Sequence, residues 1–233
     1  MDDWLQRTLA LIGEGAFERL NQSHVIVFGL GGVGSYAVET LARCGVGKMT
    51  IVDADAISVS NINRQLFALH STVGILKTQV AAERIADINP LCKVTQLPIF
   101  YDSQQADAVF AEKYDFCIDA IDTVSAKIDL VLQCKERDIP IISCMGTGNK
   151  LRAEKLQIGK LSKTHTCPLC RVMRRELKKR NLGDIPVVWS DEEPVSLVVD
   201  GSNGRHAPAS IAFVPPVAGF LLAEYVVLQL IEN

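Results

Sequence analysis

Residues 24–34 read HVIVFGLGGVG, and this stretch decides the fold. Its first five residues form an apolar run rich in β-branched side chains, which predicts a buried strand. The run passes without a linker into a glycine-rich turn and then into a helical pattern, SYAVETLARC, over residues 35–44. A strand, a glycine-rich turn and a helix in this order are typical of the first unit of a parallel sheet that binds a nucleotide.

Short strand-like runs and helical patterns continue to alternate along the chain. After about residue 150 the strand-like runs become shorter, and one of the helical patterns is strongly basic. Apolar strands that are each followed by a helix predict a parallel sheet covered on both faces, with right-handed crossovers. We therefore expect an α/β, Rossmann-like, doubly wound and mainly parallel sheet with a C-terminal elaboration. Further strands are expected at 48–53, 92–100, 114–122, 139–146, 156–162 and 187–190, and further helices at 77–89, in the stretch between 100 and 114, at 124–138, at 168–180 and from about 216.

Length and composition allow a single folded unit. With 233 residues, 48% hydrophobic and 22% charged, the chain is neither disordered nor of low complexity. No internal repeat or long linker divides it, so we predict one domain over 1–233, with a nucleotide-binding part at about 1–150 and a substrate-facing part at about 151–233. The 24 basic and 27 acidic residues give a net charge of −3, which excludes a histone-like polycation but not a local basic patch.

The seven cysteines are an odd number scattered mostly through apolar segments, which indicates a reducing compartment. The N-terminus lacks the pattern of a signal peptide, and the apolar stretch 213–231 carries two prolines and Glu224, so we expect a packed helix and a cytoplasmic protein without a membrane span.

Two of the cysteines form a close pair in the sequence, Cys167 and Cys170. With His165 as a third candidate ligand and no fourth nearby, we expect no zinc.

The glycine-rich turn predicts a phosphate site. Glycines let the backbone approach an anion, and the following helix presents free N–H groups to it. Asp53 ends the next strand, where a carboxylate can accept hydrogen bonds from both ribose hydroxyls. These features serve NAD, FAD and ATP equally well, so they predict a nucleotide and not a reaction. The four glycines are Gly29, Gly31, Gly32 and Gly34.

The loop after the second strand, DADAISVSNINRQ over residues 53–65, narrows the choice. A hydride transfer develops no large negative charge and has no need for an arginine and carboxamides here. A nucleotidyl transfer builds charge on phosphate oxygens, which cations such as Arg64 stabilise. Lys77 opens the next helix and is a second cation placed to reach phosphates. Asp122, beyond a later strand, lies at the carboxyl end of the sheet, where beside a triphosphate it suggests Mg²⁺.

These segments together resemble the ATP-binding signature of the ThiF/MoeB/HesA family, whose members adenylate a carboxylate. The resemblance runs from about Arg7 to Asp122. It implies ATP and Mg²⁺, a homodimer, and an N-terminal arginine, here Arg7, that enters the partner's site. Catalytic roles are thereby implied for Arg7, Arg64, Lys77 and Asp122, with Asp122 also associated with the metal. Nucleotide contacts are implied for Gly29, Gly31, Gly32, Gly34, Asp53, Asp55, Asn61, Asn63, Arg64, Gln65 and Lys77.

The second half resembles the branch of this family that dehydrates threonylcarbamoyladenosine next to the anticodon of tRNA. The resemblance lies in SKTHTCPLCRVMRRELKKR over 162–180, VVWSDEEPV over 187–195 and ASIAFVPPVAGFLLAEYV over 209–226. It implies tRNA carrying threonylcarbamoyladenosine as the substrate, and is compatible with a sulfur-relay protein and a monovalent cation. A basic helix in an otherwise acidic chain suits a phosphate backbone. Its basic residues are Arg171, Arg174, Arg175, Lys178, Lys179 and Arg180.

Two alternatives remain open from the sequence. One is adenylation of the C-terminal glycine of a ubiquitin-like sulfur carrier, although activators of that kind usually carry two CxxC pairs and this chain has one. The other is a dinucleotide-binding module or NAD-dependent oxidoreductase, which would leave Arg64 and Lys77 unexplained. The turn-rich stretch 200–210 is expected to be a mobile loop.

Overall fold

The computed structural model describes residues 3–195 and 208–232. Most of the turn-rich stretch 200–210 lies outside these residues.

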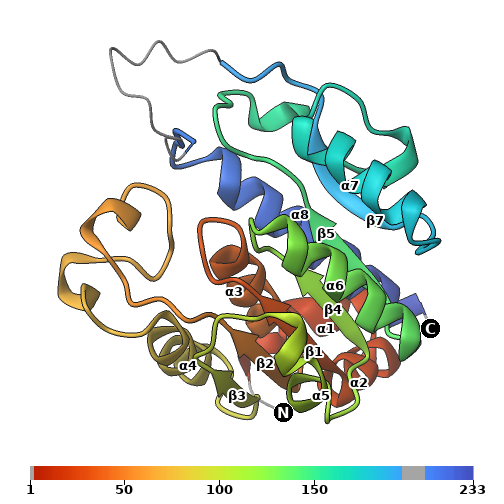
Figure 1. Ribbon diagram of the computed structural model, residues 1–233. Coiled ribbons are helices and arrows are strands. Elements are labelled where there is room, and N and C mark those ends of the chain that lie inside the picture. Colours follow the sequence, from red (N-terminus) through yellow and green to blue (C-terminus); the bar gives the residue numbers. More distant parts are fainter. Residues whose placement is uncertain (1–2, 196–207, 233) are drawn as a thin grey trace.

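Seven strands form one sheet in the order β3-β2-β1-β4-β5-β7-β6 (Figure 1). All neighbouring pairs are parallel except β6 and β7, which are antiparallel. The expected doubly wound, mainly parallel sheet is thus confirmed, and the strands after residue 150 extend the same sheet. The strands are β1 (His24–Phe28), β2 (Lys48–Val52), β3 (Lys93–Leu97), β4 (Phe116–Asp119), β5 (Ile141–Cys144), β6 (Leu156–Lys160) and β7 (Pro186–Ser190).

The central strand β1 divides its side chains between two cores. Val25 and Val27 belong to one hydrophobic cluster, and Ile26 and Phe28 to the other, and all four are fully buried. Because successive side chains of a strand point to opposite faces, a continuous apolar run is what a sheet covered on both sides requires.

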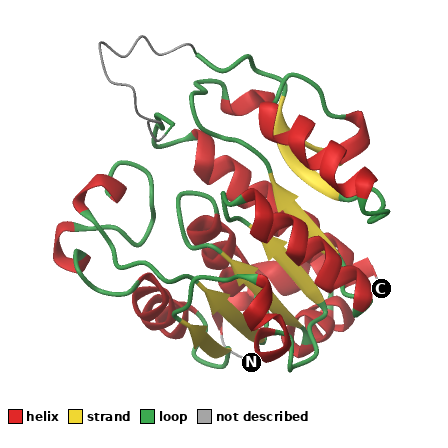
Figure 2. Cartoon of the chain, viewed as in Figure 1, coloured by secondary structure: helices red, strands yellow, loops and turns green. Residues whose placement is uncertain are grey.

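Helices cover both faces of the sheet (Figure 2). Helices α2, α3, α4 and α8 supply buried side chains to the first cluster, and α5, α6 and α7 supply them to the second. The helices are α1 (Gln6–Ile12), α2 (Glu14–Gln22), α3 (Gly34–Cys44), α4 (Lys77–Ile88), α5 (Ala106–Val109), α6 (Val124–Glu136), α7 (Pro168–Lys179) and α8 (Val214–Glu232). Short 3₁₀ turns span Asp3–Leu5, Val59–Asn61, His70–Thr72, Ser103–Gln105, Ala153–Lys155 and Leu161–Lys163.

The last helix, α8, is long and apolar enough to cross a membrane by length and composition alone, with a mean hydropathy of 1.7. It is the one helix of the described residues with this property. Half of its apolar window is buried in this fold, where it packs on α3. Core helices have the same composition, so α8 is the packed helix that the sequence predicts.

The chain turns at Gly13, with φ of +81°, between α1 and α2. One helical segment differs from expectation. The stretch between β3 and β4 holds only the four-residue α5 and a 3₁₀ turn. Here Tyr101 and Phe110 pack on Phe28, with ring centroids 4.9 and 5.9 Å away, so aromatic packing replaces a longer helix.

A buried carboxylate joins α3 to α4. Glu39 is 8% exposed and accepts hydrogen bonds from Arg84 at 2.6 and 2.9 Å and from Arg43 at 2.8 Å. Burial alone would raise the pKa of Glu39, but the hydrogen bonds from Arg84 and Arg43 outweigh it and the pKa is lowered. A depressed pKa means that this carboxylate stabilises the fold above its unfolded value of 4.5, and that the contribution is lost as the pH falls through the lower folded-state pKa.

We therefore expect Glu39→Gln to lower the free energy of unfolding by about 1 kcal/mol at pH 7, roughly the difference between a charge-assisted and a neutral hydrogen bond. The difference in the free energy of unfolding between wild type and variant should disappear at a pH well below 4.5. Urea unfolding at both pH values measures it. Glu83→Gln, at an exposed position of α4, is the matched control. An equal effect of both substitutions would contradict the assignment.

Candidate functional site

A cavity of about 370 Å³ opens where β1, β2 and β4 end. The carboxyl ends of parallel strands meet at the same edge of a sheet, which is where ligands bind in such folds. The structure brings ten of the residues singled out from the sequence to the lining of this cavity. They are Gly29, Gly31, Gly32, Asp53, Asp55, Asn61, Arg64, Gln65, Lys77 and Asp122.

The turn between β1 and α3 requires glycine at two positions. Gly29 has φ of +87°, and a Cβ there would lie 2.8 Å from the carbonyl oxygen of Ala120. A Cβ on Gly34 would lie 1.8 Å from the carbonyl oxygen of Gly29. Gly34 does not line the cavity, but it lets α3 begin directly behind the turn, so that the free N–H groups of the helix face the ligand site.

Asp53 is held in place by the backbone. One of its carboxylate oxygens accepts the N–H of Leu30 at 2.7 Å, and the other accepts the N–H of Asp55 at 2.9 Å. A carboxylate oxygen has more than one lone pair, so both oxygens keep acceptor capacity. The carboxylate is therefore oriented in advance for a donor pair such as ribose hydroxyls.

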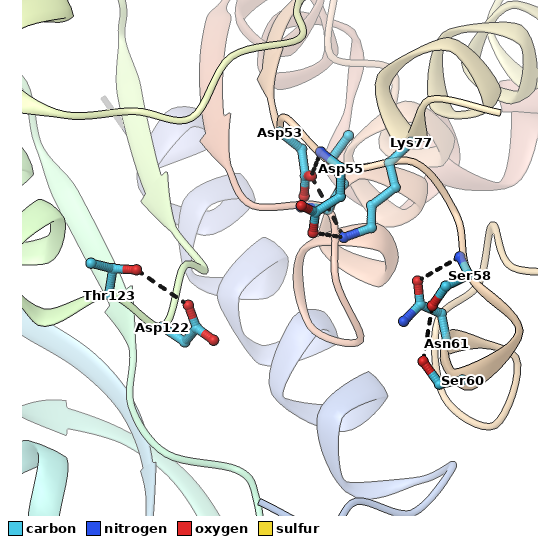
Figure 3. Close-up of polar contacts among 9 residues, drawn as sticks. Asp53, Asp55, Ser58, Ser60, Asn61, Lys77, Asp122 and Thr123 are labelled. Carbon is cyan, nitrogen blue, oxygen red and sulfur yellow. Dashed lines mark hydrogen bonds and ion pairs between the residues drawn. The ribbon is translucent and has the colours of Figure 1, made fainter. Parts of the chain in front are cut away.

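Lys77 is buried beside two carboxylates (Figure 3). Its Nζ lies 2.6 Å from Asp55 Oδ2 and 3.5 Å from Asp53 Oδ1, and the residue is only 5% exposed. The first residue of α4 thus reaches the ends of β2, as its position in the sequence predicts. An ammonium group in this position can transfer its contacts to phosphate oxygens when a nucleotide enters the cavity.

The loop from Ser58 to Gln65 orients the remaining polar side chains. Asn61 Oδ1 accepts the N–H of Ser58 at 3.1 Å, which closes the 3₁₀ turn. The half-buried Arg64 donates to Ser60 O at 3.1 Å and to Asn63 Oδ1 at 2.8 Å. Arg64 therefore faces the cavity with part of its guanidinium already engaged.

Asn63 lies apart from the cavity. Its Nδ2 donates to Ser210 O at 3.1 Å, which ties this loop to the segment before α8. Among the described residues, the structure thus gives Asn63 a linking contact and no place in the cavity lining.

Asp122 stands in the loop after β4, on the other side of the cavity from Lys77 (Figure 3). Its exposed carboxylate has one contact nearby, at 3.5 Å from Thr123 Oγ1. Within residues 3–195 and 208–232, no three metal-ligating side chains come together. A Mg²⁺ ion here would therefore depend on Asp122, water and phosphate oxygens, which is a common arrangement for this metal.

A second cavity of about 470 Å³ adjoins the first and was not foreseen from the sequence. The two share Gly32, Arg64 and Asp122 in their linings. Cys167 and the buried Lys150 line the second cavity but not the first. They come together because β5, the start of α7 and the segment before α8 meet there. A substrate group in the second cavity would lie next to a nucleotide in the first.

The basic helix α7 borders the same region, since its first residues line the second cavity. Its basic side chains differ in whether they already have partners within the chain. Arg175, Lys179 and Arg180 share Glu176, whose pKa is lowered to about 2, mainly by its hydrogen bond from Arg180. Arg174 donates to Thr164 O at 2.8 Å.

Arg171 and Lys178 remain available for a partner. Both are exposed, and no ion pair or hydrogen bond partner lies near their side chains within the described part of the chain. A further cavity of about 550 Å³ runs from Arg175 and Arg180 to Tyr101 and Thr123, and the latter two residues also line the first cavity. The basic helix is therefore beside the candidate site and not on the far side of the molecule.

Arg7 lies elsewhere in this chain. It is an exposed residue of α1 and lines none of the cavities described above.

A buried ion pair supports the loop that carries Asp122, and it too was missed. Lys127 Nζ lies 2.8 Å from Asp119 Oδ2, with both side chains fully buried, and Ser143 Oγ donates to the same carboxylate. The spacing of Asp119 and Lys127, eight residues apart from a strand end into a helix, was the available signal. In the sequence Lys127 is one more charge on an amphipathic helix.

The fold and the site together are those of a nucleotide-binding protein. Residues 5–227 match the model of the ThiF family, and this chain belongs to that family. The chain is 43% identical to the tRNA threonylcarbamoyladenosine dehydratase of Bacillus subtilis (strain 168), over 95% of this chain and 92% of that protein. It is 35% identical to the molybdopterin-synthase adenylyltransferase of Escherichia coli (strain K12), over 54% of this chain and 50% of that protein.

Comparison with solved structures also finds dehydratases of this kind. The structure of the Escherichia coli tRNA N6-threonylcarbamoyladenosine dehydratase in complex with AMP matches with a TM-score of 0.90 and 34% identity. The structure of the same enzyme in complex with ATP has a TM-score of 0.88. Each match covers 100% of this chain and 96% of the other.

Proposed function

We propose that this chain is an ATP-dependent tRNA threonylcarbamoyladenosine dehydratase. The observation that carries the proposal is the convergence of Arg64, Lys77 and Asp122 on one cavity at the carboxyl edge of the sheet, next to Asp53 and the glycine-rich turn. Similarity to dehydratases over almost the whole chain supports the choice of substrate.

The chemistry proceeds in two balanced steps. A carboxylate oxygen of threonylcarbamoyladenosine attacks the α-phosphate of ATP, and pyrophosphate leaves, which forms a mixed anhydride with AMP. An internal nucleophile of the modified nucleoside then attacks the carbonyl carbon and AMP leaves with one carboxylate oxygen, so the nucleoside loses water overall. Arg64 and Lys77 stabilise the negative charge that builds on phosphate oxygens in the first step.

Asp53 would hold the ribose, and the turn from Gly29 to Gly34 would hold phosphate oxygens on backbone N–H groups. Asp122 would hold a Mg²⁺ ion together with phosphate oxygens, and this ion would neutralise charge on the triphosphate when bound. The monovalent cation and the sulfur-relay protein suggested by the family resemblance stay predictions.

The test is AMP formation from ATP with tRNA that carries threonylcarbamoyladenosine, compared with tRNA of the same sequence that lacks it. We expect AMP only with the modified tRNA, and a cyclised nucleoside lighter by one water on mass spectrometry of its digest. Equal AMP formation with both tRNAs would refute the substrate.

The sulfur-carrier alternative has a distinct outcome. Exchange between ATP and pyrophosphate that depends on a ubiquitin-like carrier protein and ignores tRNA would favour it. The shorter match to a molybdopterin-synthase adenylyltransferase supports this alternative less than the near full-length matches support the dehydratase. Tight binding of NAD without binding of ATP would select the oxidoreductase alternative.

Helix α7 would contact the tRNA backbone through its unpaired cations. Arg171→Ala and Lys178→Ala should each weaken tRNA binding and reduce the slope of log K against log salt by about 1, because each removes one phosphate contact. Binding should be followed by fluorescence anisotropy over a salt series. Lys113→Ala, at an exposed position on the loop before β4, is the matched control. Unchanged slopes in both α7 variants would remove this helix from the interface.

We further propose a homodimer in which Arg7 of one subunit completes the site of the other. Arg7 is exposed and lines none of the cavities described above, which suits a role across an interface. Arg7→Ala and Arg64→Ala should each be impaired alone, and mixing the two proteins should restore part of the activity, because mixed dimers contain one site with neither substitution. No recovery after subunit exchange, verified by mass spectrometry of the mixture, would contradict a shared site.

All seven cysteines are free thiols in the structure. This state suits a reducing compartment, so we propose a cytoplasmic location.

A further inference from the structure

The proposed dehydratase chemistry uses no cysteine, yet two thiols stand beside the site. Cys167 precedes the first residue of α7 and Cys170 lies in its first turn. Cys167 is 3% exposed and lines the second cavity, whereas Cys170 is completely buried and is not part of the lining. Residues three apart in a helical turn have Cα atoms about 5 Å apart. A disulfide spans about 4.4–6.8 Å between Cα atoms, so this pair can close with little movement.

The backbone around Cys167 is arranged to stabilise a thiolate. The pKa of Cys167 is lowered by the neighbouring thiol of Cys170, and burial opposes this, while the N–H groups of Cys170, Gly146 and Leu169 lower it further. The same contact with Cys167, together with burial, raises the pKa of Cys170. A thiol with a lowered pKa at the cavity and a second thiol with a raised pKa in contact with it are the two components of a reactive dithiol.

The chain before the pair is held in an unusual conformation. Thr166 has φ of +61°, in the left-handed region that β-branched residues rarely adopt. The ring of the neighbouring His165 packs on Trp189 at 4.7 Å, and its Nδ1 contacts Thr166 Oγ1 at 2.9 Å. Within the described residues, no three metal-ligating side chains come together here or elsewhere.

A third thiol in the same cavity provides an internal comparison. Cys144 on β5 lines the second cavity and is 4% exposed, almost the same as Cys167. Burial raises the pKa of Cys144 to about 12. Because the exposed fractions of the two thiols are almost equal, a difference between their reaction rates would reflect the difference between their pKa values.

We propose that Cys167 and Cys170 form a thiol–disulfide exchange site whose co-reactant is a small disulfide that enters the second cavity. The thiolate of Cys167 attacks one sulfur of the small disulfide, which forms a mixed disulfide and releases one thiol. Cys170 loses its proton and attacks the Cys167 sulfur, which closes the protein disulfide and releases the second thiol. The protein loses two electrons and the proton of Cys170, and the small disulfide takes them up, together with one proton from solvent, to become two thiols.

The site is placed to affect the neighbouring chemistry. The second cavity is also lined by Arg64 and Asp122, so a group attached to Cys167 would occupy space next to the proposed nucleotide site. This consequence depends on the proposed function, whereas the thiol chemistry itself does not.

The experiment uses the full chain, reduced with a phosphine that is then removed, and oxidised glutathione as the probe. Intact mass and peptide mapping after alkylation follow the products over time. Wild type should pass through a glutathione adduct on Cys167 to an internal disulfide that lacks two hydrogens. Cys170→Ser, and Cys170→Ala as a second variant, should stop at the adduct. Cys144→Ser should react as wild type does.

Iodoacetamide labelling gives an independent readout. At pH 7 we expect Cys167 to be alkylated at least about tenfold faster than Cys144, because the thiolate is the nucleophile. Labelling of Cys167 should change less with pH above 7 than labelling of Cys144, because the pKa of Cys167 is lowered and that of Cys144 is raised. The charged or titratable groups near the pair are Cys144 and Arg174 and, in the lining of the second cavity, Arg64, Asp122 and Lys150. Circular dichroism of each variant verifies the fold.

Several results would overturn the proposal. They are an adduct that never resolves in the wild type, an internal disulfide that still forms in both Cys170 variants, equal labelling of Cys167 and Cys144, and stoichiometric zinc retained by the reduced protein. Failure of AMP formation alone would affect the proposed function and leave the thiol chemistry untouched.

Discussion

Replacing Lys77 with alanine should slow AMP formation by about 10²–10³-fold, a loss of roughly 3–4 kcal/mol of transition-state stabilisation. The ammonium group is 5% exposed and already lies between the carboxylates of Asp53 and Asp55, so it is held where a triphosphate would enter. Charge on phosphate oxygens increases in the transition state, so the maximal rate should fall more than the affinity for ATP.

The measurement is AMP release under saturating ATP and modified tRNA, with the dissociation constant of ATP measured by calorimetry on the same preparation. Lys113→Ala, at an exposed position outside the cavity, is the matched control and should retain wild-type turnover. Arg64→Ala should lose activity by a similar factor. Normal turnover of the Lys77 variant would contradict the proposed role of this cation on the phosphates.

Replacing Lys127 with methionine should lower the free energy of unfolding by about 3–5 kcal/mol. The substitution leaves the carboxylate of Asp119 fully buried without the ammonium group that now lies 2.8 Å from it. Replacement of both partners, with Asp119→Val in addition, should recover part of the loss, because no uncompensated charge then remains in the core.

Urea unfolding of the two variants and of wild type checks this prediction. Glu154→Ala is the control, because Glu154 pairs with Arg152 at 3.6 Å with both side chains about two-thirds exposed, and it should change stability by less than about 0.5 kcal/mol. A loss of under about 1 kcal/mol in Lys127→Met would contradict this stabilising role of the buried pair.

Much of the nucleotide cavity could be predicted because its determinants are local. The turn from Gly29 to Gly34 follows directly from a strand and opens a helix, and Asp53 ends the adjacent strand. Parallel strands place their carboxyl ends at one edge, so Arg64 and Lys77 could be placed near the turn without coordinates.

Other predictions were incomplete because contacts between distant segments decided them. The basic helix was visible in the sequence, and so was the spacing that lets Glu176 pair with Arg180 and Lys179 one turn later. The contact of Arg174 with Thr164, which precedes the helix, required side-chain positions. Asn63 belongs to the same loop as Arg64 and yet turns to Ser210, 147 residues later in the chain. The short α5 likewise reflects aromatic packing on Phe28 and not a local helix signal.

The sequence by itself determined the order of strands and helices, the sheet covered on both faces, and the nucleotide edge, because periodicity and glycine placement act over a few residues. The tertiary structure alone decided the second cavity, the buried pair of Lys127 and Asp119, and the position of Cys167 beside the site. These depend on β5, α6, α7 and the segment before α8 packing together. Such packing brings together residues that are far apart in the chain, and no local pattern encodes the distance between them.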